Sequence, residues 1–210
     1  MRPFWARKVA AMSAMSVDVL LIASVVIVSV AAWAVKALKN AFILSPVRVK
    51  QRKEIHRLLT AGWIHADPTH LLFNMLTLWF FAKGVLNVLG PVKFLALYVS
   101  AVFVGFIPTT LRFMNKPNYS SLGASGAVAA VMFSAILLFP GMRVGIAFLP
   151  VAVPGFVYAI LYLAYSAWHS YRGRDGINHD AHFTGAVYGV IVTFIFEPDR
   201  ALDTIKHFQL

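Results

Sequence analysis

Hydrophobic runs of helical length alternate with short polar breaks along this chain. The runs lie near residues 17–37, 69–88, 92–112, 125–139, 144–168 and 181–197. Most approach the roughly 20 residues that a helix needs to cross a bilayer. Glycine and proline mark several breaks, and no Ser/Gly-rich linker or internal repeat divides the chain. We therefore predict an all-α, polytopic membrane protein in which residues 1–210 form a single domain of six transmembrane helices.

Composition supports this prediction. The 210 residues are 60% hydrophobic and 13% charged, a balance unlike that of a soluble domain. A cleaved signal peptide is the alternative for the first run, because Arg2, Arg7 and Lys8 precede it. The run is longer than the apolar core of a signal peptide, which favours a retained helix. Because cysteine is absent, any catalysis must use serine, histidine or carboxylate side chains.

The net charge of +11 comes from lysines and arginines beside the apolar runs. Such residues bind anionic lipid headgroups, so the charge does not indicate nucleic acid. Many lie in the connection after the first run, whose amphipathic piece 41–49 is expected to lie on the membrane surface. The orientation stays undecided, because a cytoplasmic amino terminus would put eight basic residues inside (2, 7, 8, 83, 93, 143, 200 and 206) and eleven outside.

Polar residues that are costly in lipid occur where the second, fourth and sixth runs begin. Alternate spans run in the same direction, so these residues are expected to meet at one face of the membrane. They are His65, His70 and Asn74 for the second run, Ser125 for the fourth, and His179, Asp180 and His182 for the sixth.

His70 and Asn74 are four residues apart and therefore share one helical face. Both can donate hydrogen bonds toward a common point. A polar clamp between helices is the structural alternative, and the spacing alone does not decide between the two.

The fourth run is short. Its 15 residues, 125–139, span roughly 22 Å of helix against about 30 Å of hydrocarbon, so Ser125 is expected below the surface in a hydrated site. Gly123 and Gly126 permit a close approach to the start of this helix. The free N–H groups there favour the negative charge that serine attack on a carbonyl creates. The structural alternative is that Ser125 only caps the helix.

In the sixth run, His182, Gly185 and Gly189 form one helical stripe, and the two glycines have GxxxG spacing. Small residues let helices pack closely, and the fourth run offers Gly126 in return. That packing would bring His182 to Ser125, whose hydroxyl needs a base to act as a nucleophile. Helix packing without catalysis is one alternative. A metal site on the histidines at 65, 70, 179 and 182 is another, although no pair has HExxH spacing.

Together these motifs resemble those of the rhomboid intramembrane serine proteases. The resemblance rests on HADPTHLLFNM at 65–75, GASGA at 123–127 and AHFTGAVYG at 181–189, in this order on alternate spans. It implies Ser125 as nucleophile, His182 as base, and an oxyanion hole from the His70 and Asn74 side chains and the Ser125 N–H. It also implies transmembrane protein substrates, no metal or organic cofactor, and a multi-pass location in a bacterial inner membrane.

Some residues depart from the family pattern. His56-Arg57 stands in place of a Trp-Arg pair, and Ala129 in place of an aromatic ring that many members stack on the catalytic histidine. What orients His182 instead is left open. The family links a mobile fifth helix to substrate entry, and Pro150 and Pro154 would kink that helix.

Two other functions stay open: a non-catalytic rhomboid-like protein that binds transmembrane segments, and a small transporter. The retained Ser125 and His182 favour the protease, and the lack of an inverted repeat disfavours the transporter. His65 and His179 are expected to make structural hydrogen bonds. Residues 197–210 form a charged tail, so no seventh helix is expected. The sequence fixes neither the natural substrate nor the oligomeric state.

Overall fold

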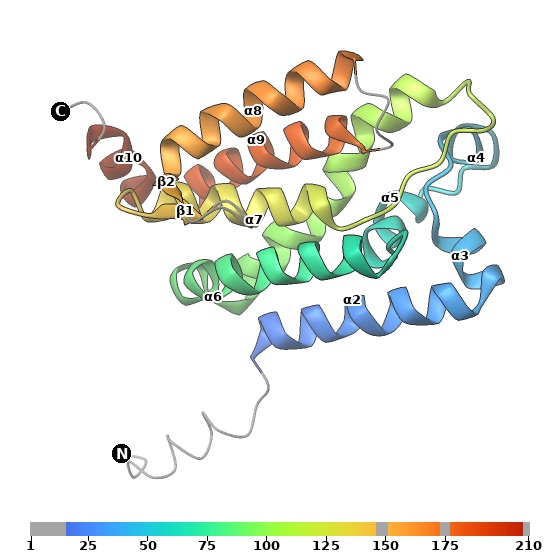
Figure 1. Ribbon diagram of the computed structural model, residues 1–210, viewed down its shortest axis with the longest axis horizontal. Helices are drawn as coiled ribbons and strands as arrows, with labels where there is room; N and C mark the ends of the chain where they lie inside the picture. Colours follow the sequence, from blue (N-terminus) through green and yellow to red (C-terminus); the bar gives the residue numbers. More distant parts are fainter. Residues whose placement is uncertain (1–15, 146–150, 173–176, 208–210) are drawn as a thin grey trace, which may run out of the picture.

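The long elements of this protein are helices. The computed structural model describes residues 16–145, 151–172 and 177–207. Its long helices are α2 (Val17–Ala34), α6 (Pro68–Phe113), α7 (Ser125–Leu138), α8 (Gly155–Arg172) and α9 (His179–Phe196). They pack against one another in one bundle, and α6, α7 and α9 all begin at the same end of it (Figure 1). The predicted all-α membrane fold is thereby confirmed.

Helix α6 contains two of the predicted spans. Its 46 residues are interrupted at Gly90, which has φ 72° and ψ 168° and is followed by Pro91. Glycine tolerates this backbone conformation, so the chain reverses there and the second half of α6 runs back along the bundle (Figure 1). A helix therefore lies within each of the six predicted runs, although not over the full length of each.

By length and apolarity, two of the described helices, α2 and α6, can cross a membrane. Helix α9 adds a third span when it is taken together with α10 (Pro198–His207), to which it is joined at an angle of 116°. Helix α7 is apolar but shorter. The count of six crossings and the single-domain assignment stay predictions.

The start of the fifth predicted span is wrong. Strands β1 (Arg143–Gly145) and β2 (Ala152–Pro154) pair antiparallel with Val144 opposite Val153, and α8 begins only at Gly155. β-branched valine and the residue before a proline both favour extended backbone. Pro154 therefore precedes the helix and does not kink it, while Pro150 lies outside the described residues.

The charged tail contains a helix that the sequence analysis did not expect. Helix α10 begins at Pro198 and turns sharply away from α9 (Figure 1). Proline suits the first position of a helix because its missing N–H would have no partner there. Ala201 and Thr204 are buried, and the Nζ of Lys93 donates to the Phe196 carbonyl at the turn (2.9 Å). Helix α10 is thus part of the packed structure.

The first connection folds into short helices: α3 (Lys36–Phe42), α4 (Pro46–Arg52), α5 (Arg57–Thr60) and the 3-10 turn η1 (Ala61–Trp63). The predicted amphipathic piece 41–49 is therefore divided between α3 and α4, and its position on the membrane surface stays a prediction. Arg57 is only 1% exposed and donates to the carbonyls of Asn40 (2.8 Å) and Ile43 (2.6 Å). Its hydrogen bond to Glu54 lowers the pKa of that carboxyl.

Helices α7 and α9 touch at their backbones. A Cβ atom added to Gly185 would lie 2.0 Å from the Gly126 carbonyl oxygen, and one added to Gly189 would lie 2.3 Å from that of Ala130. No side chain fits in such gaps, so glycine is required on the α9 side. Further along the same interface the hydroxyls of Thr193 and Ser134 share a 2.7 Å hydrogen bond. This contact sets the separation of the two helices that carry Ser125 and His182.

We expect Gly185→Ala to destabilise the protein, because the methyl group must push α9 away from α7. Overpacking of this kind typically costs about 1–3 kcal/mol. Gly141→Ala is the matched control, since nothing lies within 4 Å of a Cβ at that position. Thermal unfolding of both variants in detergent measures the effect, and equal melting temperatures would contradict the close contact.

Candidate active site

Ser125 is the first residue of α7 and does not cap it. The N-cap is Ala124, and no side-chain hydrogen bond caps the helix. The half-buried Ser125 side chain points instead to α9, where its Oγ lies 2.7 Å from Nε2 of His182. A serine hydroxyl and an imidazole at this distance share a hydrogen bond, through which the ring can accept the hydroxyl proton.

The His182 ring is packed between aromatic side chains from two helices. Tyr162 of α8 stacks on it, with ring centroids 6.3 Å apart and an interplanar angle of 25°. His179, one turn earlier on α9, meets it edge-on at 5.8 Å. Tyr162 was not predicted from the sequence, because a ring supplied by another helix leaves no local pattern.

Hydrogen bonds to distant parts of the chain hold the segment that leads to Ser125. Ser121 exchanges two backbone bonds with Leu44, of 3.0 and 3.1 Å, and the Gly123 N–H donates to the Ala61 carbonyl (2.9 Å). The Ala124 N–H donates to Nε2 of His65 (3.3 Å). Non-helical backbone at membrane depth must be bonded within the protein, and here the first connection supplies the partners.

His65 connects this segment to α2. Its ring is 1% exposed, and its Nδ1 lies 3.0 Å from the Ser29 hydroxyl. Ser29 donates its proton to the Trp63 carbonyl (3.0 Å), so the ring nitrogen must be the donor to Ser29. Nε2 is then unprotonated and accepts from Ala124. His65 is thus a neutral, structural histidine, in line with its expected role.

Asn178 is the second support that the sequence analysis missed. It caps α9 by accepting from the Ala181 N–H (3.1 Å), and its oxygen also accepts from Thr109 of α6 (2.7 Å). Its amide donates to the Ser121 hydroxyl (2.9 Å). The only sequence signal was an asparagine just before the helix, a common N-cap. One side chain therefore ties the start of α9 to α6 and to the segment before Ser125.

His70 and Asn74 lie on the first two turns of α6. The His70 ring is against Gly123, where an added Cβ would lie 2.7 Å from the ring. Gly123 has φ +116°, a conformation that glycine favours. Asn74 is 7% exposed, and its amide donates to the His70 carbonyl (2.9 Å). His70 thus touches the chain two residues before Ser125.

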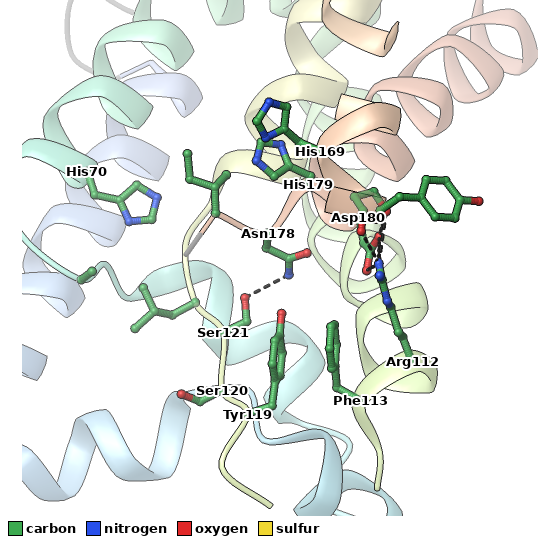
Figure 2. A pocket seen from close by; sticks show the side chains of 15 residues that line it. His70, Arg112, Phe113, Tyr119, Ser120, Ser121, His169, Asn178, His179 and Asp180 are labelled. Atoms are coloured by element: carbon green, nitrogen blue, oxygen red, sulfur yellow. Dashed lines mark hydrogen bonds and ion pairs between the residues drawn. The ribbon is translucent and has the colours of Figure 1, made fainter. Parts of the chain in front are cut away.

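A polar cavity of about 370 Å3 opens beside these residues, between α6, the segment before Ser125, and the facing ends of α8 and α9 (Figure 2). His70 lines one part of it, and Asn178 lies near its centre. Arg112 and Asp180 form an ion pair (3.2 Å) at another part, and Arg112 also donates to the Ser170 carbonyl (2.6 Å). These bonds join the ends of α6, α8 and α9 around the cavity.

The predicted site residues thus lie at one end of the bundle. His179 is buried and packs on His169 and Tyr165 of α8. Within the residues that the structure describes, no three histidine or carboxylate side chains gather as metal ligands would.

Comparison with known proteins identifies the family. The family model of the rhomboid domain matches residues 52–198. The chain belongs to the rhomboid family.

Several curated relatives support this assignment. The mitochondrial presenilin-associated rhomboid-like protein of Mus musculus is 31% identical over 137 residues, which are 63% of this chain and 36% of that protein. The mitochondrial RHOMBOID-like protein 12 of Arabidopsis thaliana is 28% identical over 167 residues, 72% of this chain and 49% of that protein. "Putative rhomboid protease YdcA" of Bacillus subtilis (strain 168) is 28% identical over 142 residues, 66% of each chain.

This rhomboid-family chain is a multi-pass integral membrane protein, as its apolar helices and its family both indicate. It spans only about a third to two thirds of the length of these relatives. The part that matches the family model contains all three motifs, because it runs from residue 52 in the first connection to residue 198, just beyond α9.

We expect His65 to make folding stability depend on pH. Burial, and secondarily the neighbouring His70, lower the pKa of His65 from 6.5 to about 3, while Asp67 acts in the opposite direction. Between these values the unfolded chain binds a proton that the folded chain excludes, so stability is full above about pH 6.5 and falls as the pH drops toward 3. His65→Gln should show a shallower fall in melting temperature over this range. Parallel curves for the two proteins would contradict the assignment.

Proposed function

We propose that this rhomboid-family protein is an intramembrane serine endopeptidase that cleaves transmembrane segments of other membrane proteins. The observation that carries the proposal is the 2.7 Å contact between Ser125 Oγ and His182 Nε2 at the half-buried start of a short helix. A weak nucleophile paired with a base is the minimum requirement for serine catalysis.

The proposed chemistry proceeds in two steps. His182 Nε2 accepts the Ser125 proton as Oγ attacks the scissile carbonyl, and the same proton then passes to the leaving amine as the peptide C–N bond breaks. The resulting acyl-enzyme is hydrolysed when His182 takes a proton from water and returns it to Ser125 Oγ. The polar cavity lined by His70, Leu122 and His179, which are neighbours of the dyad, is the proposed route for that water.

The negative oxygen formed in each step needs hydrogen-bond donors. We assign this role to the Ser125 N–H and to the side chains of His70 and Asn74. The N–H groups of the first helical turn have no partner within the helix, and the contact of His70 with Gly123 puts its ring near this start. The amide of Asn74 holds a second proton beyond the one donated to the His70 carbonyl.

Transmembrane segments are the proposed substrates. An apolar groove of about 570 Å3 lies between the first half of α6, α7, strand β1 and α8. Phe73, Leu76, Phe80 and Tyr158 are among its lining residues. Such a lining fits a helix arriving from the lipid.

We propose a bacterial plasma membrane as the location, with support from the similarity to the Bacillus protein over 66% of both chains. Anionic lipid headgroups are the proposed partners of the first connection, where Lys36, Lys50, Arg52 and Lys53 are exposed. A non-catalytic protein or a transporter would not need Ser125 and His182 in hydrogen-bond contact.

Ser125→Ala should abolish cleavage of a fluorescent transmembrane substrate by the purified protein, with a loss in kcat of about 10⁴-fold or more, because the nucleophile is gone. Ser100→Ala is the matched control: its hydroxyl only bonds the Ala96 and Leu97 carbonyls of its own helix. Labelling by a fluorophosphonate probe should disappear in the first variant alone. Cleavage that persists in Ser125→Ala would overturn the serine mechanism.

Asn74→Ala tests the oxyanion assignment. Loss of one oxyanion donor typically lowers kcat by about 10²–10³-fold, whereas the lost hydrogen bond to His70 contributes only about 1 kcal/mol to stability. We therefore expect a large fall in kcat with a small fall in melting temperature. Ser100→Ala again controls for loss of a side-chain bond on α6. A large melting shift with nearly normal kcat would identify Asn74 as a structural clamp instead.

A further inference from the structure

Helix α7 offers no aromatic support to His182. The α7 residue one turn after Ser125 is Ala129, which is 2% exposed and packs near Ala186 of α9. A methyl group covers little of an imidazole ring. The geometry of a general base must nevertheless be fixed, because proton transfer requires its nitrogen to stay within hydrogen-bond reach of the hydroxyl.

Tyr162 of α8 supplies the aromatic contact to His182 that α7 lacks. Its ring lies nearly parallel to that of His182, at 25° and 6.3 Å, within the range over which aromatic rings attract each other. Tyr162 is itself fixed by Phe133 of α7, at 5.5 Å, and by Tyr158 one turn earlier on α8, at 5.9 Å. The ring therefore has defined packing partners on two helices.

Tyr158 also borders the apolar groove between α6 and α8. Three rings consequently stand in series from the groove to the base: Tyr158, Tyr162 and His182. Apart from these contacts α8 has a largely exposed outer face, on which Ile160, Leu161 and Trp168 are each more than 60% exposed. The helix that supports His182 therefore also lines part of the groove and has a largely exposed outer face.

We propose that Tyr162 is a positioning residue for His182, which holds the imidazole toward Ser125, and that Tyr158 buttresses it from the groove side. The role rests on the proposed function, because a base needs positioning only if it acts. The position of α8 then determines how well the dyad is aligned, and a segment seated in the groove contacts Tyr158, the first ring of the series.

Kinetics of three variants test this role. Tyr162→Leu should lower kcat for a transmembrane substrate by about 10- to 100-fold, the cost of a misplaced catalytic group, with KM nearly unchanged. Tyr162→Phe keeps the ring and should retain kcat within about twofold. Tyr165→Leu is the matched control, since it removes a ring from the same helix that contacts His169 and His179 but not His182. Normal kcat in Tyr162→Leu, or an equal loss in Tyr162→Phe, would overturn the proposal.

A second measurement separates this proposal from the proteolytic function. In protein with isotope-labelled histidine, the His182 ring signals, assigned through His182→Gln, should keep their shifts in Tyr162→Phe and should shift or broaden in Tyr162→Leu. A wild-type protein that cleaves nothing would refute the proposed function, while the spectra would still decide whether Tyr162 positions the ring. Unchanged His182 signals in Tyr162→Leu would refute the positioning role even in an active protease.

Discussion

The backbone contact between α7 and α9 is the constraint on which the rest of the site depends. Ser125 is the first residue of α7, next to Gly126, which packs against the Ala181 carbonyl of α9. His182 lies in the first turn of α9, about one turn before Gly185, which packs against the Gly126 carbonyl of α7. Because the helices touch without intervening side chains, the separation of the two residues is set by main-chain packing. A 2.7 Å contact between Oγ and Nε2 follows without any long, flexible side chain.

The segment before Ser125 shows how a short helix can begin inside the bundle. Extended backbone is unfavourable in hydrocarbon unless its polar groups are bonded. Leu44, Ala61 and His65 supply these bonds, and all three come from the stretch between α2 and α6. The first connection thus holds the segment before Ser125 in place, in addition to any contact that it makes with lipid. Asn178 adds a bond from the opposite side, so the segment is held between two parts of the chain.

Helix α8 differs from the other helices around the site. It meets α9 through rings, namely Tyr162, Tyr165 and His169, and through the hydrogen bond from Ser170 to Asp180. Rings can slide and tilt with smaller cost than interlocked backbones, because each ring pair contributes only about 0.5–1.5 kcal/mol beyond its buried area. The site therefore joins a pair of helices in backbone contact, α7 and α9, to a helix, α8, that is held by side-chain contacts.

The sequence by itself determined the helical class, the six apolar runs and the meeting of Ser125 with His182. These three features can be read from the length of each apolar run, from the GxxxG spacing, and from the rule that alternate spans run in the same direction. The sequence wrongly predicted Pro154 inside a helix, because the pairing of β2 with β1 leaves no local pattern. It also predicted no helix over residues 198–207, because the burial of Ala201 depends on packing against other helices. Only the tertiary structure selected Tyr162 and Asn178, since each acts on residues that are close in space but distant along the chain, and many tyrosines and asparagines would satisfy the same local pattern.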